Sequence, residues 1–179
     1  MHSSSMFLRP IERSDLPTYV SWGRDRTFCE HAGWTVDLPE PAHEAHWRAL
    51  VEQPRQNLVR LAAVVGDEVV GYVDLAGEEP DRRELGYVIG PSERWGHGLG
   101  GTAARLGLGY GFHWLGLRDI WAEAVDANRA SIRILIGLGM TETGRGHDEP
   151  FLGASSYYRQ FTISAESWRC NQLRGRRRV

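Results

Sequence analysis

The spacing of hydrophobic and polar residues predicts strands and helices over most of the chain. The runs LVRLAAVV at residues 58–65 and VVGYVDLA at residues 69–76 favour strands, and Gly66 and Asp67 between them predict a tight hairpin turn. Elsewhere apolar side chains recur every three or four residues, as they do on helices. The expected strands are residues 7–9, 58–65, 69–76, 83–89, 119–125, 140–144 and 156–163, and the expected helices are residues 14–22, 42–52, 99–115 and 128–138.

Local signals refine these boundaries. Ser14 is expected to be the N-cap of the first helix, and Gly139 the C-cap of the last. Residues 27–41 contain glycine, proline and aromatics without a clear period, so we expect a loop there. The inward faces of two helices are expected to carry Ala42, His46, Ala49 and Leu50 in one, and Ile132, Leu135 and Ile136 in the other.

The resulting order of elements predicts an α/β domain with a mixed sheet. The length of 179 residues suits one domain, and 41% hydrophobic and 25% charged residues are typical of a soluble globular protein. No apolar run is long enough to span a membrane, and the N-terminus lacks the apolar stretch of a signal peptide. The two cysteines form no CxxC pair and are expected to be reduced thiols, so we expect a cytoplasmic protein.

Charge is unevenly distributed along the chain. The net charge is −2, which gives no overall attraction to nucleic acid, and every one of the 21 basic residues is an arginine. The end of the chain, WRCNQLRGRRRV, is basic, whereas acidic residues cluster at 30–44, 74–81 and 148–149. Such clusters are usually solvated loops, but if they meet in one cleft they favour a cationic substrate such as an amine.

Residues 87–101, YVIGPSERWGHGLGG, place a glycine-rich loop between a strand and a helix with an apolar face. Glycines let a ligand approach the main chain, and the free N–H groups of a helix N-terminus bind anions, so this loop favours a phosphate or pyrophosphate. A flexible turn is the alternative. The chain lacks the GxxxxGK[ST] of a P-loop. Gly96, Gly98 and Gly101 match GxGxxG by letter, but Asp119 opens a strand where a dinucleotide fold needs an acid at a strand end.

Three linked motifs resemble the GNAT superfamily of N-acetyltransferases. The loop WGHGLG at residues 95–100 fits the family's pattern [R/Q]-x-x-G-x-[G/A], with Trp95 in place of the usual Arg or Gln, as in the ribosomal-protein N-acetyltransferase branch. DANRASIRILIGLGM at residues 126–140 and ELGYVIGP before the loop are also similar to family segments. The resemblance implies a GNAT fold over residues 1–165, with a mixed, mostly antiparallel sheet flanked by helices and splayed at the cofactor cleft. Residues 166–179 would be an Arg-rich tail.

The same resemblance implies that acetyl-CoA is the cosubstrate, with no metal. The backbone of Val88 and Ile89 would pair with the pantetheine arm, and one N–H would polarise the thioester carbonyl. Asn128 and Ser131 would contact the arm, although both are also ordinary helix-capping residues. The pyrophosphate would be held by Gly96, His97, Gly98, Leu99, Gly100, Gly101 and Thr102, with Arg94 and His97 offering side chains.

Acetyl transfer to an amine needs a base, because most alkyl amines are protonated at neutral pH. Glu123 is the first candidate, since peptide N-terminal acetyltransferases of the family carry a glutamate on this strand, and Glu84 is the second. Either could instead face solvent. The family's general-acid tyrosine corresponds to Leu135 here, so Tyr157 or Tyr158 are the substitutes. Neighbours on a strand point to opposite faces, so at most one of the two tyrosines can reach the site.

The function expected from these motifs is transfer of an acetyl group from acetyl-CoA to a primary amine by direct attack. The acceptor would be a protein N-terminus, such as that of a ribosomal protein, or a small polyamine or aminoglycoside. A membrane is not an expected partner, nucleic acid is expected only through a ribosomal substrate, and a homodimer is a possible assembly. The alternative is a non-catalytic acyl-CoA-binding or RNA-associated module, since the usual tyrosine is missing and an Arg-rich segment binds phosphate backbones.

Overall fold

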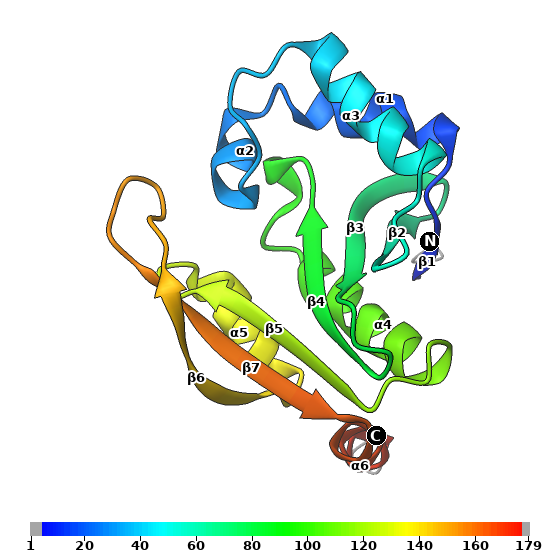
Figure 1. Ribbon diagram of the computed structural model, residues 1–179, viewed down its shortest axis with the longest axis vertical. Coiled ribbons are helices and arrows are strands. Elements are labelled where there is room, and N and C mark those ends of the chain that lie inside the picture. The colour runs from blue at the N-terminus through cyan, green and yellow to red at the C-terminus, as the bar shows by residue number, and fades with distance from the viewer. Residues whose placement is uncertain (1–4, 177–179) are drawn as a thin grey trace. The chain divides into compact units, whose positions relative to one another are not determined.

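The computed structural model describes residues 5–176, and of residues 174–176 only the backbone (Figure 1). Within that range the strands follow the hydrogen-bonded order β1-β2-β3-β4-β5-β7-β6. The strands are β1 (Met6–Pro10), β2 (Leu58–Val65), β3 (Glu68–Ala76), β4 (Arg82–Ile89), β5 (Asp119–Val125), β6 (Thr141–Asp148) and β7 (Tyr157–Ser164). The helices are η1 (Arg13–Asp15), α1 (Leu16–Trp22), α2 (Arg26–Ala32), α3 (Glu40–Glu52), η2 (Ser92–Arg94), α4 (Leu99–His113), α5 (Arg129–Gly137) and α6 (Ala165–Arg176).

The expected mixed α/β fold is confirmed. β1 and β2 are antiparallel, as are β5 with β7 and β7 with β6, whereas β4 and β5 run parallel. Two compact units can be distinguished: one holds the chain up to Asp74 together with Tyr87–Leu106, and the other holds Leu75–Gly86 and the chain from Gly107 onward. In the described part of the chain, no helix combines the length and apolar character needed to cross a bilayer.

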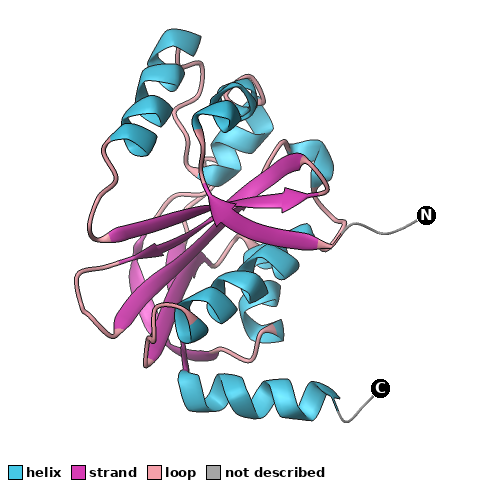
Figure 2. Cartoon of the chain, turned by 90° about the vertical axis from the view of Figure 1, so that its right-hand side faces the viewer, coloured by secondary structure: helices cyan, strands magenta, loops and turns pink. Residues whose placement is uncertain are grey.

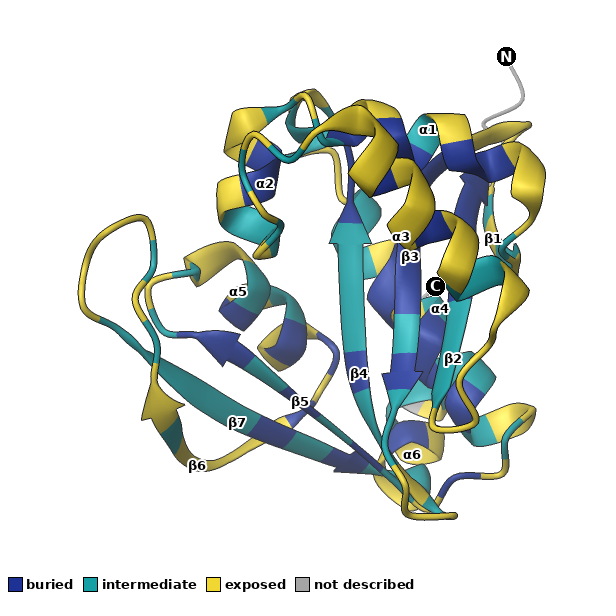
Figure 3. Ribbon diagram, turned by 45° about the horizontal axis from the view of Figure 1, so that its top comes forward, coloured by how far each residue is buried: buried dark blue, intermediate teal, exposed yellow. Residues whose placement is uncertain are grey.

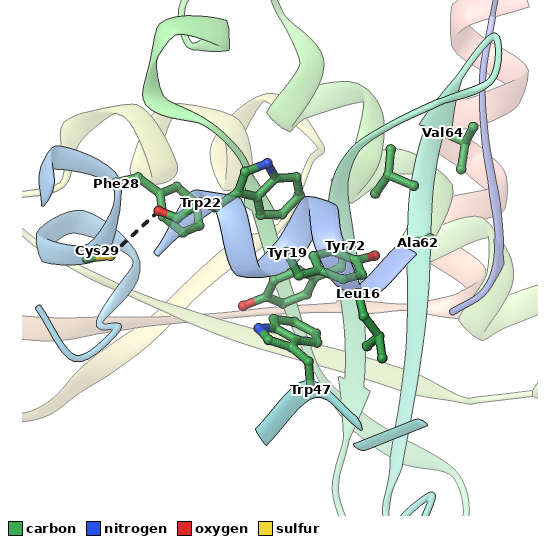
Figure 4. Packing of buried hydrophobic residues seen from close by; sticks show 10 residues of the cluster. Leu16, Tyr19, Trp22, Phe28, Cys29, Trp47, Ala62, Val64 and Tyr72 are labelled. Atoms are coloured by element: carbon green, nitrogen blue, oxygen red, sulfur yellow. Dashed lines mark hydrogen bonds between the residues drawn. The ribbon is translucent and has the colours of Figure 1, made fainter. Parts of the chain in front are cut away.

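The core of the first unit is a cluster of aromatic rings beneath α1 and α3 (Figure 4). The rings of Tyr19 and Trp47 stack at 4.2 Å, and Tyr72 of β3 meets Trp47 edge-on at 5.5 Å. The guanidinium of Arg60 lies 4.6 Å from the centre of the Tyr72 ring and donates two hydrogen bonds to Asp74. This cluster fixes two helices against β2 and β3.

The expected loop at residues 27–41 is wrong in its first part, because Arg26–Ala32 form helix α2. Asp25 caps this helix by accepting a hydrogen bond from the Phe28 N–H at 2.9 Å, and Gly33 ends it in the left-handed conformation with φ 69°. Only two consecutive side chains of the helix, Phe28 and Cys29, are buried. Two adjacent buried residues in a helix of seven give no helical repeat of apolar positions that could be recognised in the sequence. The packing of Phe28 and Cys29 in the core, and not a local pattern, therefore determines this helix.

Two details of the first helices also differ from expectation. Ser14 is not an N-cap; it lies inside η1, where Glu12 and Asp15 form a reciprocal capping box. In α3 the buried side chains are His43 and Trp47. Of the face predicted for α3, Leu50 packs against the aromatic cluster as expected, but the inward placement of Ala42, His46 and Ala49 is wrong: these three are exposed, because the large Trp47 ring sets the rotation of the helix.

In the second unit, half-buried and buried residues alternate along β5 as far as Ala124, and Figure 3 colours each residue of the ribbon by its burial. Ile120, Ala122 and Ala124 are buried, and α5 packs against this strand. Trp121 and Glu123 point the other way and remain half-buried. The alternation follows from the two-residue period of a strand and leaves polar side chains on the open face.

Helices α5 and α6 complete this unit. Ile132 and Leu135 of α5 are buried as expected, but Ile136 is 54% exposed, so its inward placement is wrong. Gly139 follows α5 with φ 81°, a conformation that favours glycine. The segment expected to be a tail is helical up to Arg176 (Figure 2), and its Trp168 is buried beside Phe112. The domain boundary at residue 165 stays a prediction, and residues 177–179 of the proposed tail lie outside the described residues.

Candidate functional site

The glycine-rich loop of the first unit is anchored at its start by two side chains. Asp25 accepts a hydrogen bond from the Ser92 N–H at 2.8 Å, and the indole of Trp95 donates to the Ile89 carbonyl at 2.8 Å. The Trp95 ring lies beside His31, with ring centres 5.0 Å apart. Trp95, which replaces the family's usual Arg or Gln, therefore packs the loop against its own strand end.

Beyond Trp95 the main chain is open. Gly96 and Gly98 adopt left-handed φ values of 82° and 78°, and at both positions, as at Gly101, an added Cβ would meet no described atom within 4 Å. The Thr102 N–H bonds to the Gly98 carbonyl and begins the helical pattern of α4. The preceding N–H groups have no partner within the helix and lie at its positive end, which suits them to a pyrophosphate such as that of coenzyme A.

Arg94 and His97, the two side chains predicted to contact the phosphates beside this loop, differ in how accessible they are. Arg94 pairs with Glu68 through Nη2, and its Nε is buried without a hydrogen-bond partner among the described residues. His97 is exposed, and its Nδ1 lies 3.2 Å from the Arg94 carbonyl oxygen. The Thr102 hydroxyl donates to the Gly98 carbonyl at 3.2 Å. His97 is thus the more accessible of the two predicted side-chain contacts.

The end of β4 carries Val88 and Ile89, whose backbone is the predicted partner of the pantetheine arm. The Ile89 side chain is buried, and its carbonyl is taken by Trp95. A Cβ at Gly71 would come within 2.3 Å of the Val88 carbonyl oxygen, so β3 and β4 approach too closely there for any side chain. No described contact tests the predicted role of the two N–H groups.

In the second unit, the open face of β5 and β7 gathers the predicted catalytic side chains. Glu123 lies opposite Gln160, and Val125 lies opposite Tyr158, so Glu123 and Tyr158 share one face. The Gln160 amide donates to Glu123 Oε2 at 3.2 Å. Among the described residues nothing donates a hydrogen bond to Glu123 Oε1, which leaves that oxygen able to accept a proton.

The two candidate tyrosines are separated by the strand. Burial, followed by the charges of Glu149, Glu123 and Glu84, raises the pKa of Tyr158. Its ring lies 4.8 Å from that of His147. Tyr157 points to the opposite face, where the guanidinium of Arg145 lies 4.0 Å from its ring centre. Tyr158, and not Tyr157, therefore shares a face with Glu123.

Glu84, the second candidate base, lies in register with Trp121 across the parallel pair of β4 and β5. Trp121 and Glu123 are two residues apart on one strand, so Glu84 belongs to the same face as Glu123. The effect of Glu84 on the pKa of Tyr158 is consistent with this placement. The unit thus brings two carboxylates and one phenol together.

Asn128 and Ser131 lie at the start of α5. The Asn128 Oδ1 accepts a hydrogen bond from the Ser131 N–H at 3.2 Å, which is the helix-capping role left open by the sequence. Leu135, which the sequence resemblance matches to the family's usual tyrosine, is buried in the core. Nowhere in the described chain do three or more His, Cys, Asp or Glu side chains gather as metal ligands would.

Four residues were not predicted from sequence: Gln160, Gly146 and His147 beside the open face of β5 and β7 in the second unit, and Asp25 at the glycine-rich loop of the first. The first three reach the site through strand register and a bulge in β6, between segments far apart in the chain. Of these four, only Gln160 could have been indicated by the sequence, because it lies two residues after Tyr158 on one strand and therefore on the same face.

Comparison with known proteins gives one family. Residues 5–141 match the family model described as an acetyltransferase (GNAT) domain. A stretch of 91 residues is 31% identical to FsC-acetyl coenzyme A-N(2)-transacetylase of Aspergillus fumigatus, covering 49% of this chain but only 38% of that protein.

Solved structures show the same fold. Spermidine N-acetyltransferase from Vibrio cholerae, in complex with CoA and spermine, has a TM-score of 0.78 at 20% identity, over 92% of this chain and 98% of that one. A GNAT-family acetyltransferase from Bacillus anthracis has a TM-score of 0.76 at 18% identity, over 93% and 98% of the two chains.

Proposed function

Because this chain belongs to the GNAT acetyltransferase family, whose members are acetyl-CoA-dependent N-acetyltransferases, we propose that it acetylates a small primary amine with Glu123 as the base. One observation carries the assignment of Glu123. Its carboxylate is fixed through one oxygen by Gln160, while the other oxygen accepts no hydrogen bond within the described residues.

The acetyl donor is acetyl-CoA, which supplies the acetyl group as an activated thioester. Gly96 to Thr102 would hold its pyrophosphate through main-chain N–H groups, with His97 as the accessible side chain. The open space around Gly96, Gly98 and Gly101 supports this assignment. With no side chain in the way, the phosphate oxygens can approach the backbone. Val88 and Ile89 are proposed to pair with the pantetheine arm, and Asn128 and Ser131 to lie along it.

Glu123 would work on the acceptor. A primary amine of ordinary pKa, about 10.4 for a lysine-like group, is almost entirely protonated at pH 7 and has no free electron pair. The oxygen of Glu123 that accepts no hydrogen bond from the described residues can bind the ammonium and take one proton, after which the nitrogen attacks the thioester carbonyl carbon. The carbon–sulfur bond breaks, and the nitrogen loses its second proton, through solvent, to the departing thiolate. Glu84 on the same face would add negative charge that attracts the cation.

We propose that the Tyr158 hydroxyl donates a hydrogen bond to the departing thiolate but contributes little as a general acid. Its raised pKa keeps the phenol protonated at neutral pH. However, a thiol has a pKa of about 8.5 and an ordinary phenol about 10, so proton transfer from tyrosine to thiolate is uphill, and a raised phenol pKa makes it more so. Solvent can protonate the thiolate as well.

The acceptor that we propose is a polyamine or another small polycation. Three carboxylates, Glu84, Glu123 and Glu149, lie near enough to Tyr158 to raise its pKa. A group of negative charges around a base favours an acceptor with more than one positive charge. The Vibrio cholerae structure with spermine supports the same choice over a protein N-terminus.

Two unpaired cysteines support the expectation of a reducing, cytoplasmic environment. Cys29 is buried and Cys170 is exposed, and neither forms a disulfide. An exposed free thiol is more common in proteins of reducing compartments.

The test is release of coenzyme A thiol from acetyl-CoA in the presence of spermidine, an aminoglycoside, a peptide with a free N-terminus, or a monoamine. We expect turnover with spermidine and a loss of about 100-fold or more for Glu123→Gln. The chain has no lysine, so its own side chains provide no amine to acetylate as background. Normal turnover by Glu123→Gln would refute the base assignment. A rise in melting temperature with acetyl-CoA, but no turnover with any amine, would favour a non-catalytic binding module.

A further inference from the structure

Gly146 of β6 is a glycine that its backbone does not require. Its φ lies outside the left-handed region, so any residue could adopt this conformation. An added Cβ, however, would lie 3.0 Å from the Tyr158 Cβ, 3.2 Å from the Gln160 Nε2 and 3.4 Å from the Glu123 Oε2. The missing side chain is therefore explained by the two groups on the neighbouring strand β7, Tyr158 and Gln160, with the Glu123 carboxylate of β5 next to them.

The position of Gly146 follows from a bulge in β6. Arg145 pairs with Arg159 and Asp148 with Tyr157, so three steps along β6 match two along β7. The extra residue brings the Gly146 backbone over the side chains of β7. Bulges of this kind re-aim the chain locally, and here the chain is turned toward the hydrogen bond between Gln160 and Glu123.

We propose that Gln160 is a positioning residue that fixes the Glu123 carboxylate for its work as a base, and that Gly146 must be a glycine so that this pair keeps its geometry. The inference rests on the proposed function. Gln160 bonds one carboxylate oxygen and so limits rotation of the carboxylate, which keeps the other oxygen in one direction. Positioning of this kind raises the rate because the base need not search for its geometry in each turnover.

Substitution of the amide tests the first part. Gln160→Leu keeps the size of the side chain but removes the donor, and we expect kcat to fall about tenfold with little change in the KM for acetyl-CoA. Gln160→Glu should not restore the rate, because it sets a like charge beside Glu123. Thr162→Val is the matched control, since Thr162 lies on the same strand and face and its hydroxyl donates to the Ile120 carbonyl at 3.3 Å. That control should keep the wild-type kcat.

The glycine offers a second matched pair. Gly146→Ala sets a methyl group 3.0 Å from the Tyr158 Cβ and 3.2 Å from the Gln160 amide nitrogen, which is tighter than ordinary contact, so the amide must shift and we expect a loss of kcat similar to that of Gln160→Leu. Gly144→Ala makes the same change two residues away on the same strand, where an added Cβ meets no described atom within 4 Å. It should behave as wild type. Equal activity of the two alanine variants would overturn the role given to Gly146.

A double-mutant cycle separates positioning from general damage. If Gln160 acts through Glu123, Gln160→Leu should cause no further loss when added to Glu123→Gln. An equal loss in both backgrounds would overturn the proposal. Full activity of Glu123→Gln alone would instead refute the base assignment of the proposed function.

A readout without acetyl-CoA completes the test. In 15N NMR spectra of the free protein, the side-chain NH2 signal of Gln160, identified by its loss in Gln160→Leu, should move in Glu123→Gln and in Gly146→Ala but not in Gly144→Ala. An unmoved signal in Glu123→Gln would mean that the hydrogen bond does not form in solution, and would overturn the positioning role whatever the activity.

Discussion

Asp25 connects the cap of α2 to the turn that leads into the glycine-rich loop, so its removal should affect both stability and acetyl-CoA binding. One carboxylate oxygen accepts from the Phe28 N–H at 2.9 Å and the other from the Ser92 N–H at 2.8 Å. Asp25→Ala removes both bonds at once. The predicted effect is a looser turn before Trp95 and a frayed start of α2.

The magnitude follows from the two bonds. Loss of a helix N-cap costs about 1 kcal/mol. A hydrogen bond between a backbone N–H and a charged group contributes about 1.5–3 kcal/mol, of which water recovers a part because Asp25 and Ser92 are half-buried. We therefore expect the free energy of unfolding to fall by about 2 kcal/mol, which for a chain of this size lowers Tm by about 4–8 °C.

The effect should depend on pH. Burial, the largest influence, raises the pKa of Asp25, but the hydrogen bonds from Phe28 and Ser92 outweigh it, and the net pKa is lowered. A carboxylate with a lowered folded-state pKa contributes stability that is present above the unfolded value, about 3.9, and is lost as the pH falls through the folded value. The stability difference between wild type and Asp25→Asn should thus be constant from pH 8 to 5 and narrow below about pH 4.

Urea and thermal unfolding at several pH values, together with acetyl-CoA titration by calorimetry, provide the assay. Glu30→Ala is the control on the same helix: it removes an exposed i,i+4 pair with Arg26, expected to be worth about 0.3–0.5 kcal/mol. Suppose Asp25→Ala were no less stable than Glu30→Ala and bound acetyl-CoA equally well. The hydrogen bonds of Asp25 would then contribute neither to stability nor to cofactor binding, and the prediction would be refuted.

Four further substitutions test other parts of the molecule. Gly98→Ala forces a Cβ into a left-handed conformation, φ 78°, at the loop, so acetyl-CoA affinity should fall about tenfold by calorimetry, whereas Gly109→Ala inside α4 should leave affinity unchanged and raise stability by about 0.5–1 kcal/mol. Asp74→Ala removes the acceptor of two hydrogen bonds from the half-buried Arg60 guanidinium, and urea unfolding should show a loss of about 1.5–3 kcal/mol; a loss under about 0.5 kcal/mol would contradict the view that this pair stabilises the fold. Tyr158→Phe should lower kcat less than about tenfold in the thiol-release assay, because proton transfer from this phenol is uphill; a loss of 1000-fold would show that it is the essential acid.

Strands and the glycine-rich loop were predictable because their signals are local. The apolar runs at 58–65 and 119–125 match β2 and β5 at both ends, since β-branched residues between turns leave few alternatives. The loop after β4 was also predictable, because consecutive glycines between a strand and a helix are visible without tertiary information.

Features that depend on contacts between distant segments were not predictable. Helix α2 has a single buried pair, and the rotation of α3 is set by Trp47 against rings from other elements. At the candidate site, Glu123 could be named from its strand, but its partnership with Gln160 depends on the register of β5 and β7, and Gly146 enters only through a bulge. The residue pattern within one strand does not indicate how that strand is aligned with a neighbouring strand.

The bulge in β6 has a further consequence for the colloidal behaviour of the protein. β6 is last in the strand order of the described chain and is exposed along most of its length, so one side of its backbone is an edge where another chain could add a strand and start aggregation. Two breaks in register, with the charged Arg145 and Asp148 beside the second, interrupt the regular row of N–H and C=O groups that such an addition needs. Deleting one residue of the second bulge would therefore remove Gly146 from Glu123 and, at the same time, lengthen the regular part of an edge prone to intermolecular pairing.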